Sequence, residues 1–86
     1  MNYEEAEQYL IDNFPYIIDI DDVFIDIYWN KLNKIMSEIF GECCIDINQL
    51  EEMANIKNKN ARWDYWGDYI FFKSEDDLIE FKLRFL

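Results

Sequence analysis

Carboxylates supply most of the chemistry that this sequence offers. Its 86 residues hold nineteen Asp and Glu side chains against eight Lys and Arg, a formal net charge of −11 at pH 7, and no histidine. Without histidine, nucleophilic catalysis by a Ser–His or Cys–His pair is excluded. The two glycines, Gly41 and Gly67, are too few for a glycine-rich phosphate-binding loop. Chemistry here must therefore rest on acidic side chains or on binding.

One grouping of acidic residues fits a metal-dependent nuclease. Glu80 and Lys82 have the spacing of the Glu-x-Lys element of such sites. Asp64 or Asp68 would supply the upstream carboxylate, and together these groups would hold Mg²⁺ and activate water. However, the motif is short, and a net charge of −11 repels a nucleic-acid substrate. We therefore predict no enzyme, no metal site and no cofactor, and we keep the nuclease as a third hypothesis.

Two other groupings are predicted to be structural. Cys43 and Cys44 are adjacent, and a disulfide between neighbouring residues is strained. We expect two reduced thiols in a half-buried turn or strand, because a metal site needs further soft ligands. Lys57, Lys59 and Arg62 form a basic cluster next to an aromatic segment, which would suit stacking of single-stranded bases. We predict instead a solvated loop that precedes a core hairpin.

The N-terminal third carries most of the excess negative charge. Residues 1–30 hold eight acidic side chains and no basic one. Asp19, Asp22 and Asp26 are spaced by three and four residues, so on one helix they would share a side, and Asp12 precedes them. Such a face can imitate the phosphates of nucleic acid and bind a basic groove. In the alternative, these carboxylates only keep an aromatic-rich protein soluble and complement helix dipoles.

Aromatic side chains provide the second candidate contact. The chain has three Trp, six Tyr and seven Phe, many for so short a sequence. In the segment Arg62–Trp66, strand alternation places Trp63 and Tyr65 on one side and Asp64 and Trp66 on the other. One side would pack on helices and leave Trp66 partly exposed. Exposed tryptophans anchor protein interfaces, so we take Trp66 and Trp29 as candidate partner-binding residues with the four aspartates above.

Hydrophobic periodicity and turn residues divide the chain into short elements. We expect helices at residues 3–14, 22–40 and 48–55 and after Ser74, and strands at 62–66 and 69–72 joined by a Gly67-Asp68 turn. Residues 16–20 or 43–47 would add a third strand, because a two-stranded hairpin alone is marginal. The predicted fold is one α+β domain, residues 1–86, in which a small antiparallel sheet with a C-terminal aromatic hairpin packs against three to four helices.

The C-terminal segment carries a resemblance. In "GDYIFFKSEDDLIEFKLRFL" (67–86), an aromatic strand leads into an acidic helix start and ends in Phe-Lys-Leu-Arg-Phe. This segment resembles the C-terminal end of various small phage-encoded proteins. The overall profile is similar to that of small acidic phage proteins that disable host enzymes or defence complexes, such as anti-CRISPR and anti-restriction proteins. The resemblance implies a stoichiometric inhibitor, and it carries over no functional residue.

Charge and hydropathy together lead to a functional hypothesis. The longest apolar runs are three or four residues, too short for a transmembrane helix, and the acidic N-terminus does not fit a signal peptide, so a cytoplasmic location is expected. We predict a DNA-mimicking inhibitor that blocks the basic groove of a nucleic-acid-handling or defence protein, without direct contact with nucleic acid or membranes. The alternative is a structural or adaptor module, in one version a homodimer, that uses exposed aromatics.

Overall fold

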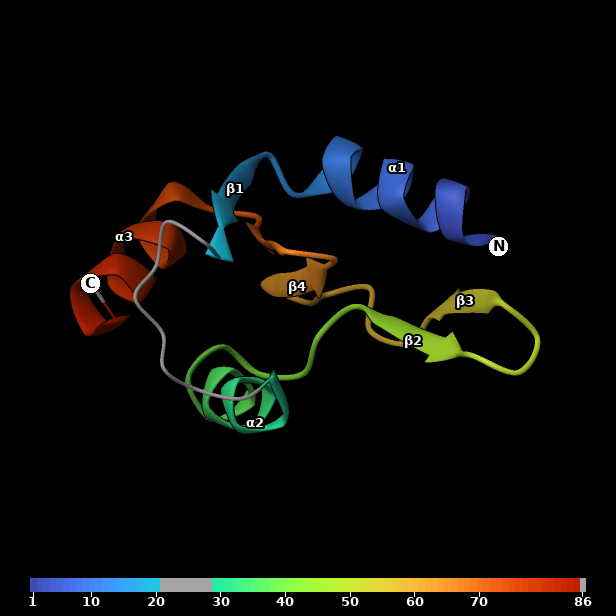
Figure 1. Cartoon of the computed structure of the whole chain (residues 1–86). Coiled ribbons are helices and arrows are strands. Elements are labelled where there is room, and N and C mark those ends of the chain that lie inside the picture. Colours follow the sequence, from blue (N-terminus) through green and yellow to red (C-terminus); the bar gives the residue numbers. More distant parts are fainter. Residues whose placement is uncertain (21–28, 86) are drawn as a thin grey trace.

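The computed structural model describes residues 1–20 and 29–85 (Figure 1). These residues form two small antiparallel sheets and three helices, an α+β fold. In chain order the elements are α1 (Tyr3–Asn13), β1 (Tyr16–Asp19), α2 (Trp29–Phe40), β2 (Ile45–Asn48), β3 (Met53–Ile56), β4 (Trp63–Trp66), β5 (Tyr69–Phe72) and α3 (Glu75–Phe85).

The larger sheet has the order β1-β5-β4, and both pairings are antiparallel. The predicted C-terminal hairpin is confirmed: β4 and β5 pair with Trp66 opposite Tyr69, which leaves a turn of two residues. Gly67 takes a positive φ of 57° there, a conformation that glycine adopts without steric cost. β1 pairs with the other side of β5, so β5 is the central strand.

The central strand supplies side chains to two separate cores, because successive residues point to opposite faces. Ile70 and Phe72 belong to the core that α2 and α3 cover, whereas Phe71 belongs to the core that α1 covers. Figure 1 shows α1 and α2 on opposite sides of β4, with α3 beside β1. The first core holds Ile18, Leu32, Met36, Phe40, Cys43, Trp63, Ile70, Phe72 and Phe81. The second holds Ala6, Leu10, Phe14, Cys44, Ile45, Ala54, Ala61 and Phe71.

The second sheet is the hairpin of β2 and β3, and it replaces the predicted helix at 48–55. Asn48 does accept the N–H groups of Leu50 and Glu51, at 3.1 and 3.3 Å, as a helix cap would. The chain then turns back instead of continuing as a helix. Ala54 in the returning strand donates its N–H to the Met1 carbonyl at 2.8 Å, and Leu50 at the turn is 98% exposed. Ala54 is buried and its neighbours are not, the alternation of a strand.

The predicted architecture, one small sheet packed against three to four helices, is therefore wrong. The region expected to be the third helix forms a second sheet, and the larger sheet gains its third strand from β1. Residues 43–47, the other candidate for that strand, contribute instead to β2. The predicted helix at 22–40 is present from Trp29 onward, and its earlier residues, 22–28, lie outside the described part of the chain.

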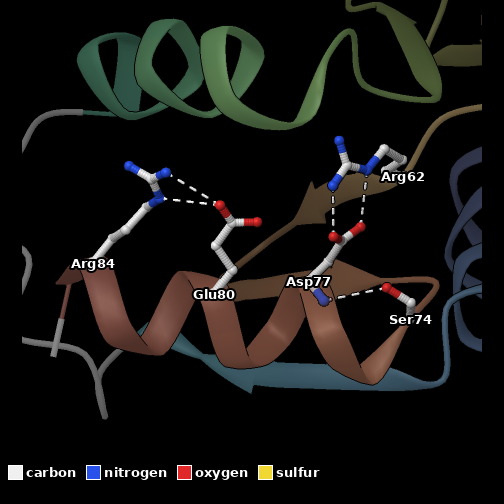
Figure 2. A network of polar contacts seen from close by, with 5 residues as sticks. All are labelled: Arg62, Ser74, Asp77, Glu80 and Arg84. Carbon is white, nitrogen blue, oxygen red and sulfur yellow. Dashed lines mark hydrogen bonds and ion pairs between the residues drawn. The ribbon is translucent and has the colours of Figure 1, made fainter.

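The last helix is fastened at its start by a polar network, which Figure 2 shows from close by. The N–H of Asp77 donates to Ser74 Oγ at 3.2 Å, the expected cap. The Asp77 carboxylate does not complete a capping box but accepts two bonds from Arg62, at 3.0 and 2.6 Å. The Arg62 guanidinium also lies 5.4 Å from the ring centre of Phe40. Arg62, predicted to belong to a solvated basic loop, thus ties α3 to the segment before β4.

Candidate protein-binding cleft

The edge of β4 is closed by a carboxylate. Asp64 Oδ2 accepts the N–H of Ile45 at 2.8 Å, and Oδ1 accepts the N–H of Tyr65 at 2.7 Å. The first bond comes from β2 and the second from β4, so one side chain joins the two sheets. A strand edge with unpaired N–H groups tends to pair with other chains, and this carboxylate occupies part of that edge.

Two adjoining cavities of about 270 Å³ each lie between β2 and β4 next to this contact. We call them together the cleft. Four residues line both cavities: Ile47, Gln49, Tyr65 and Trp66. The aromatic cavity is lined further by Tyr3 and Gly67. The polar cavity is lined further by Asn33, Cys43, Ile45, Asp46, Lys57 and Asp64.

The rings of the aromatic cavity are held from behind. Trp66 meets Tyr3 of α1 at 5.6 Å between ring centres, with ring planes 81° apart. Tyr65 stacks on Trp63 at 5.8 Å, and Trp63 is anchored because its Nε1 donates to the Gly41 carbonyl at 2.7 Å. A ligand that enters this cavity therefore meets side chains whose positions are already fixed, which lowers the entropy cost of binding.

The polar cavity contains a buried carboxyl group. Asp64 is only 2% exposed, and burial raises its pKa to about 6. Hydrogen bonds from the N–H groups of Tyr65, Ile45 and Cys44, and the positive charge of Lys57, act in the opposite direction. Lys57 itself forms an ion pair with Glu42 at 3.6 Å. Near neutral pH the carboxyl group of Asp64 in this cavity is therefore mostly ionised.

The two cysteines point into different cores. Both thiols are free and buried, Cys43 in the core under α2 and Cys44 in the core under α1. Burial is the main cause that raises the pKa of the Cys43 thiol, and the Asp64 charge adds to it. A protonated thiol is a poor nucleophile. The prediction of two reduced thiols is confirmed, although they are buried and not half-buried.

The predicted binding residues are only partly described. Asp12 is exposed on α1 and accepts a bond from Gln8 at 2.8 Å, and Asp19 is partly exposed at the end of β1. Because Asp19 belongs to a strand, the predicted stripe of Asp19, Asp22 and Asp26 on one helix is wrong at its first member. Asp22, Asp26 and the side chain of Trp29 lie outside the described residues.

Trp66 is the one predicted anchor that the described structure brings into a cavity. It is half-buried, as expected of a partly exposed tryptophan. Sequence reasoning missed Tyr3, Ile47 and Gln49, which come from other elements. The sequence signal that could have located the cleft is Asp64, an acidic residue between two aromatic residues of a predicted strand. A carboxylate buried at such a position needs N–H donors close by, so it marks a strand edge that another backbone segment approaches.

The groups of the nuclease hypothesis do not come together. Among residues 1–20 and 29–85, no three Cys, Asp or Glu side chains are placed to hold a metal ion. Asp68 is exposed at the β4–β5 turn, whereas Asp64 is buried beside β2. Glu80 lies on α3, where it pairs with Arg84 at 3.1 Å (Figure 2). The geometry therefore offers a binding cleft and no metal centre in this part of the chain.

No protein-family model, curated protein or solved structure matches this chain. Within the described residues, none of the helices has the length and hydrophobicity needed to span a bilayer. Function is thus inferred from the cleft, the surface charge and the exposed side chains.

Proposed function

We propose that this protein is a non-enzymatic binding protein that blocks the basic nucleic-acid-binding groove of a host defence or nucleic-acid-handling protein. One observation carries the proposal: residues 1–30 contain eight acidic side chains and no basic one. Surface carboxylates can take the place of phosphates opposite Lys and Arg. A net charge of −11 likewise disfavours direct contact with nucleic acid or anionic membranes. The resemblance to small phage inhibitors is in keeping with stoichiometric action inside a host cell.

The geometry of α1 supports the proposal. Its buried residues, Ala6 and Leu10, lie on one side. At 100° per residue, Glu4 and Asp12 fall on the opposite side and Glu7 falls on one flank, and all three are exposed. Their charges have no basic partner on the same helix, since α1 contains no Lys or Arg. This helix therefore presents a carboxylate surface to solvent.

The test uses the immobilised protein as bait in a nuclease-treated bacterial lysate. A captured nucleic-acid-binding protein is expected to be released as salt rises from about 0.05 M to about 0.3 M, because screening weakens contacts between exposed charges. Duplex DNA added at constant salt is expected to displace it, since DNA and bait would compete for one groove. Capture that survives both treatments would contradict the proposal.

A matched pair of charge variants locates the surface. The combined change Glu4→Gln, Glu7→Gln and Asp12→Asn removes three exposed charges from α1. The control, Glu51→Gln, Glu75→Gln and Asp76→Asn, removes three exposed charges elsewhere. We expect the α1 variant to bind the captured partner about tenfold more weakly and the control to change affinity by less than about threefold. Equal losses of affinity in the two variants would mean that binding depends on the total charge of the protein and not on the α1 surface.

A second candidate function is a structural or adaptor module that self-associates. It is favoured by an apolar pair on α3: Ile79 and Leu83 are one turn apart and are 47% and 80% exposed. Burial of these side chains in a homodimer would depend little on salt. Sedimentation at low and moderate salt separates the candidates. A micromolar dimer that ignores salt, with no captured partner, would overturn the inhibitor, and a monomer at both salts would overturn the module.

A further inference from the structure

We propose that the aromatic cavity of the cleft binds an arginine side chain of the basic partner. The inference depends on the proposed function, because it names the chemical group through which such a partner is held. Tyr3, Tyr65 and Trp66 line this cavity. A guanidinium stacks on aromatic faces and keeps its charge at every physiological pH.

The aromatic side chains reach the cavity from different directions. Tyr65 packs on the core under α2 and α3, whereas Trp66 packs on the core under α1. Tyr65 and Trp66 therefore lie on opposite faces of β4 at the outer edge of this strand. The ring of Tyr3 lies at 81° to that of Trp66. A planar group inserted beyond the edge of β4 would meet rings on several sides. This arrangement suits a guanidinium better than a compact apolar group.

The backbone of β2 adds polar acceptors. The N–H of Lys57 donates to the Cys44 carbonyl at 2.9 Å, and that of Ile45 donates to Asp64, away from β3. Because antiparallel pairs alternate, the carbonyl of Ile47 also points away from β3, toward the outer edge of β2. The side chains of Ile47 and Gln49 line both cavities. The first can cover the alkyl stem of an arginine, and the amide oxygen of the second can accept a guanidinium N–H.

Charge selects a cation over a neutral group for this cavity. Asp46 and Asp64 line the adjoining polar cavity, and Asp68 directly follows Gly67 in the turn. The cation that lines the cleft, Lys57, is paired with Glu42. Arginine is preferred over lysine because its guanidinium is planar and less strongly hydrated, so it loses less on leaving water for a ring-lined site.

The test compares three short peptides that differ at one position. Each has the sequence acetyl-Gly-Lys-Gly-X-Gly-Lys-Gly-amide, where X is arginine, lysine or citrulline, the neutral analogue of arginine. Both flanking lysines interact with the acidic surface in all three. We expect the arginine peptide to bind about fivefold more tightly than the citrulline peptide, with a shift of the Trp66 indole N–H signal in NMR spectra.

Variants place the effect in the cleft. Trp66→Leu is expected to abolish the difference between the arginine and citrulline peptides, whereas Tyr69→Leu is expected to preserve it. Tyr69 is the matched control because it is exposed, lies opposite Trp66 in the hairpin and does not line the cavity. Since Trp66 also contacts a core, Ile47→Arg provides a second variant at an exposed position. The guanidinium introduced at this position is expected to weaken binding of the arginine peptide about fivefold, because it repels the peptide's charge and occupies the cavity.

The possible results separate this proposal from the previous one. If all three peptides bind alike, or if Trp66→Leu and Ile47→Arg leave the arginine preference unchanged, the arginine site is wrong, although salt-sensitive capture of a partner would still support the inhibitor. If the arginine preference is present and depends on Trp66, but no basic protein is captured from lysate, the site stands and the proposed inhibitor falls.

Discussion

The two sheets of this protein are stabilised by different forces. The larger sheet is built on large apolar side chains, among them Trp63, Phe72 and Phe81, which are almost fully buried. The β2–β3 hairpin places mainly smaller groups in its core and is joined to the rest by directional bonds. Ala54 of β3 exchanges two bonds with Met1, at 2.8 and 2.9 Å, and Ile45 of β2 donates to Asp64. Removal of side-chain volume should therefore destabilise mainly the larger sheet. A change of pH or the loss of a hydrogen bond should destabilise mainly the β2–β3 hairpin.

The largest expected effect comes from a cavity in the apolar part. Phe72 is fully buried, with ring centres of Phe40 and Phe81 at 5.3 and 5.6 Å. Phe72→Ala should cost about 3–5 kcal/mol of unfolding free energy, most of the stability of a domain this small. Urea unfolding followed by circular dichroism measures the loss. Ile79→Ala on the exposed face of α3 is the control, and a similar loss there would contradict the assignment of the core.

The next largest loss of stability should affect the two sheets differently. Asp64→Ala leaves the N–H groups of Ile45 and Tyr65 without their acceptor, which should cost about 2–4 kcal/mol at pH 5, where the carboxyl is mostly uncharged. Amide hydrogen exchange should show lost protection at Ile45 and retained protection at Ile70. Asp46→Ala, at an exposed neighbour in β2, should change little. Equal loss of protection at Ile45 and Ile70 would mean that the two sheets unfold together and do not differ in their dependence on this hydrogen-bonded carboxylate.

A pH effect of moderate size should come from the same group. The folded-state pKa of Asp64 is about 6, above its ordinary value of 3.8. Its stabilising contribution is therefore complete below pH 3.8 and is lost as pH rises through 6, since the unfolded chain releases this proton more readily. Between pH 5 and pH 7 we expect a loss of about 1 kcal/mol in wild type relative to Asp64→Asn. Parallel pH profiles of the two proteins would contradict the raised pKa.

The smallest expected effect lies in the turn of the hairpin. Glu52 has a positive φ of 51°, which costs an ordinary residue about 1 kcal/mol and glycine almost nothing. Glu52→Gly should stabilise the protein by about 0.5 kcal/mol after the entropy cost of glycine is subtracted. Thermal unfolding measures the gain. Glu51→Gly next to it should destabilise, and a gain there instead would show that the turn conformation is not the cause.

The contrast between the sheets also explains what the sequence could predict. The β4–β5 hairpin followed from local signals, alternating aromatics around a Gly-Asp turn. The β2–β3 hairpin did not, because Asn48 makes the contacts of a helix cap and only distant partners, Met1 and Asp64, settle the outcome. The cleft was equally hidden, since its lining comes from three segments far apart along the chain, near Tyr3, Ile47 and Trp66. Trp66 alone could be named in advance.

The adjacent cysteines have one more consequence. Cys43 and Cys44 are covalent neighbours, yet each thiol lies in a different core. Their thiols therefore report on the two cores separately: a bulky thiol reagent reaches Cys44 only when the core under α1 opens, whereas Cys43 also borders the polar cavity of the cleft. Equal labelling rates at the two positions would mean that the cores open as one unit across the shared strand β5. Faster labelling at Cys44 would mean that α1 and the β2–β3 hairpin detach first, ahead of the rest of the molecule.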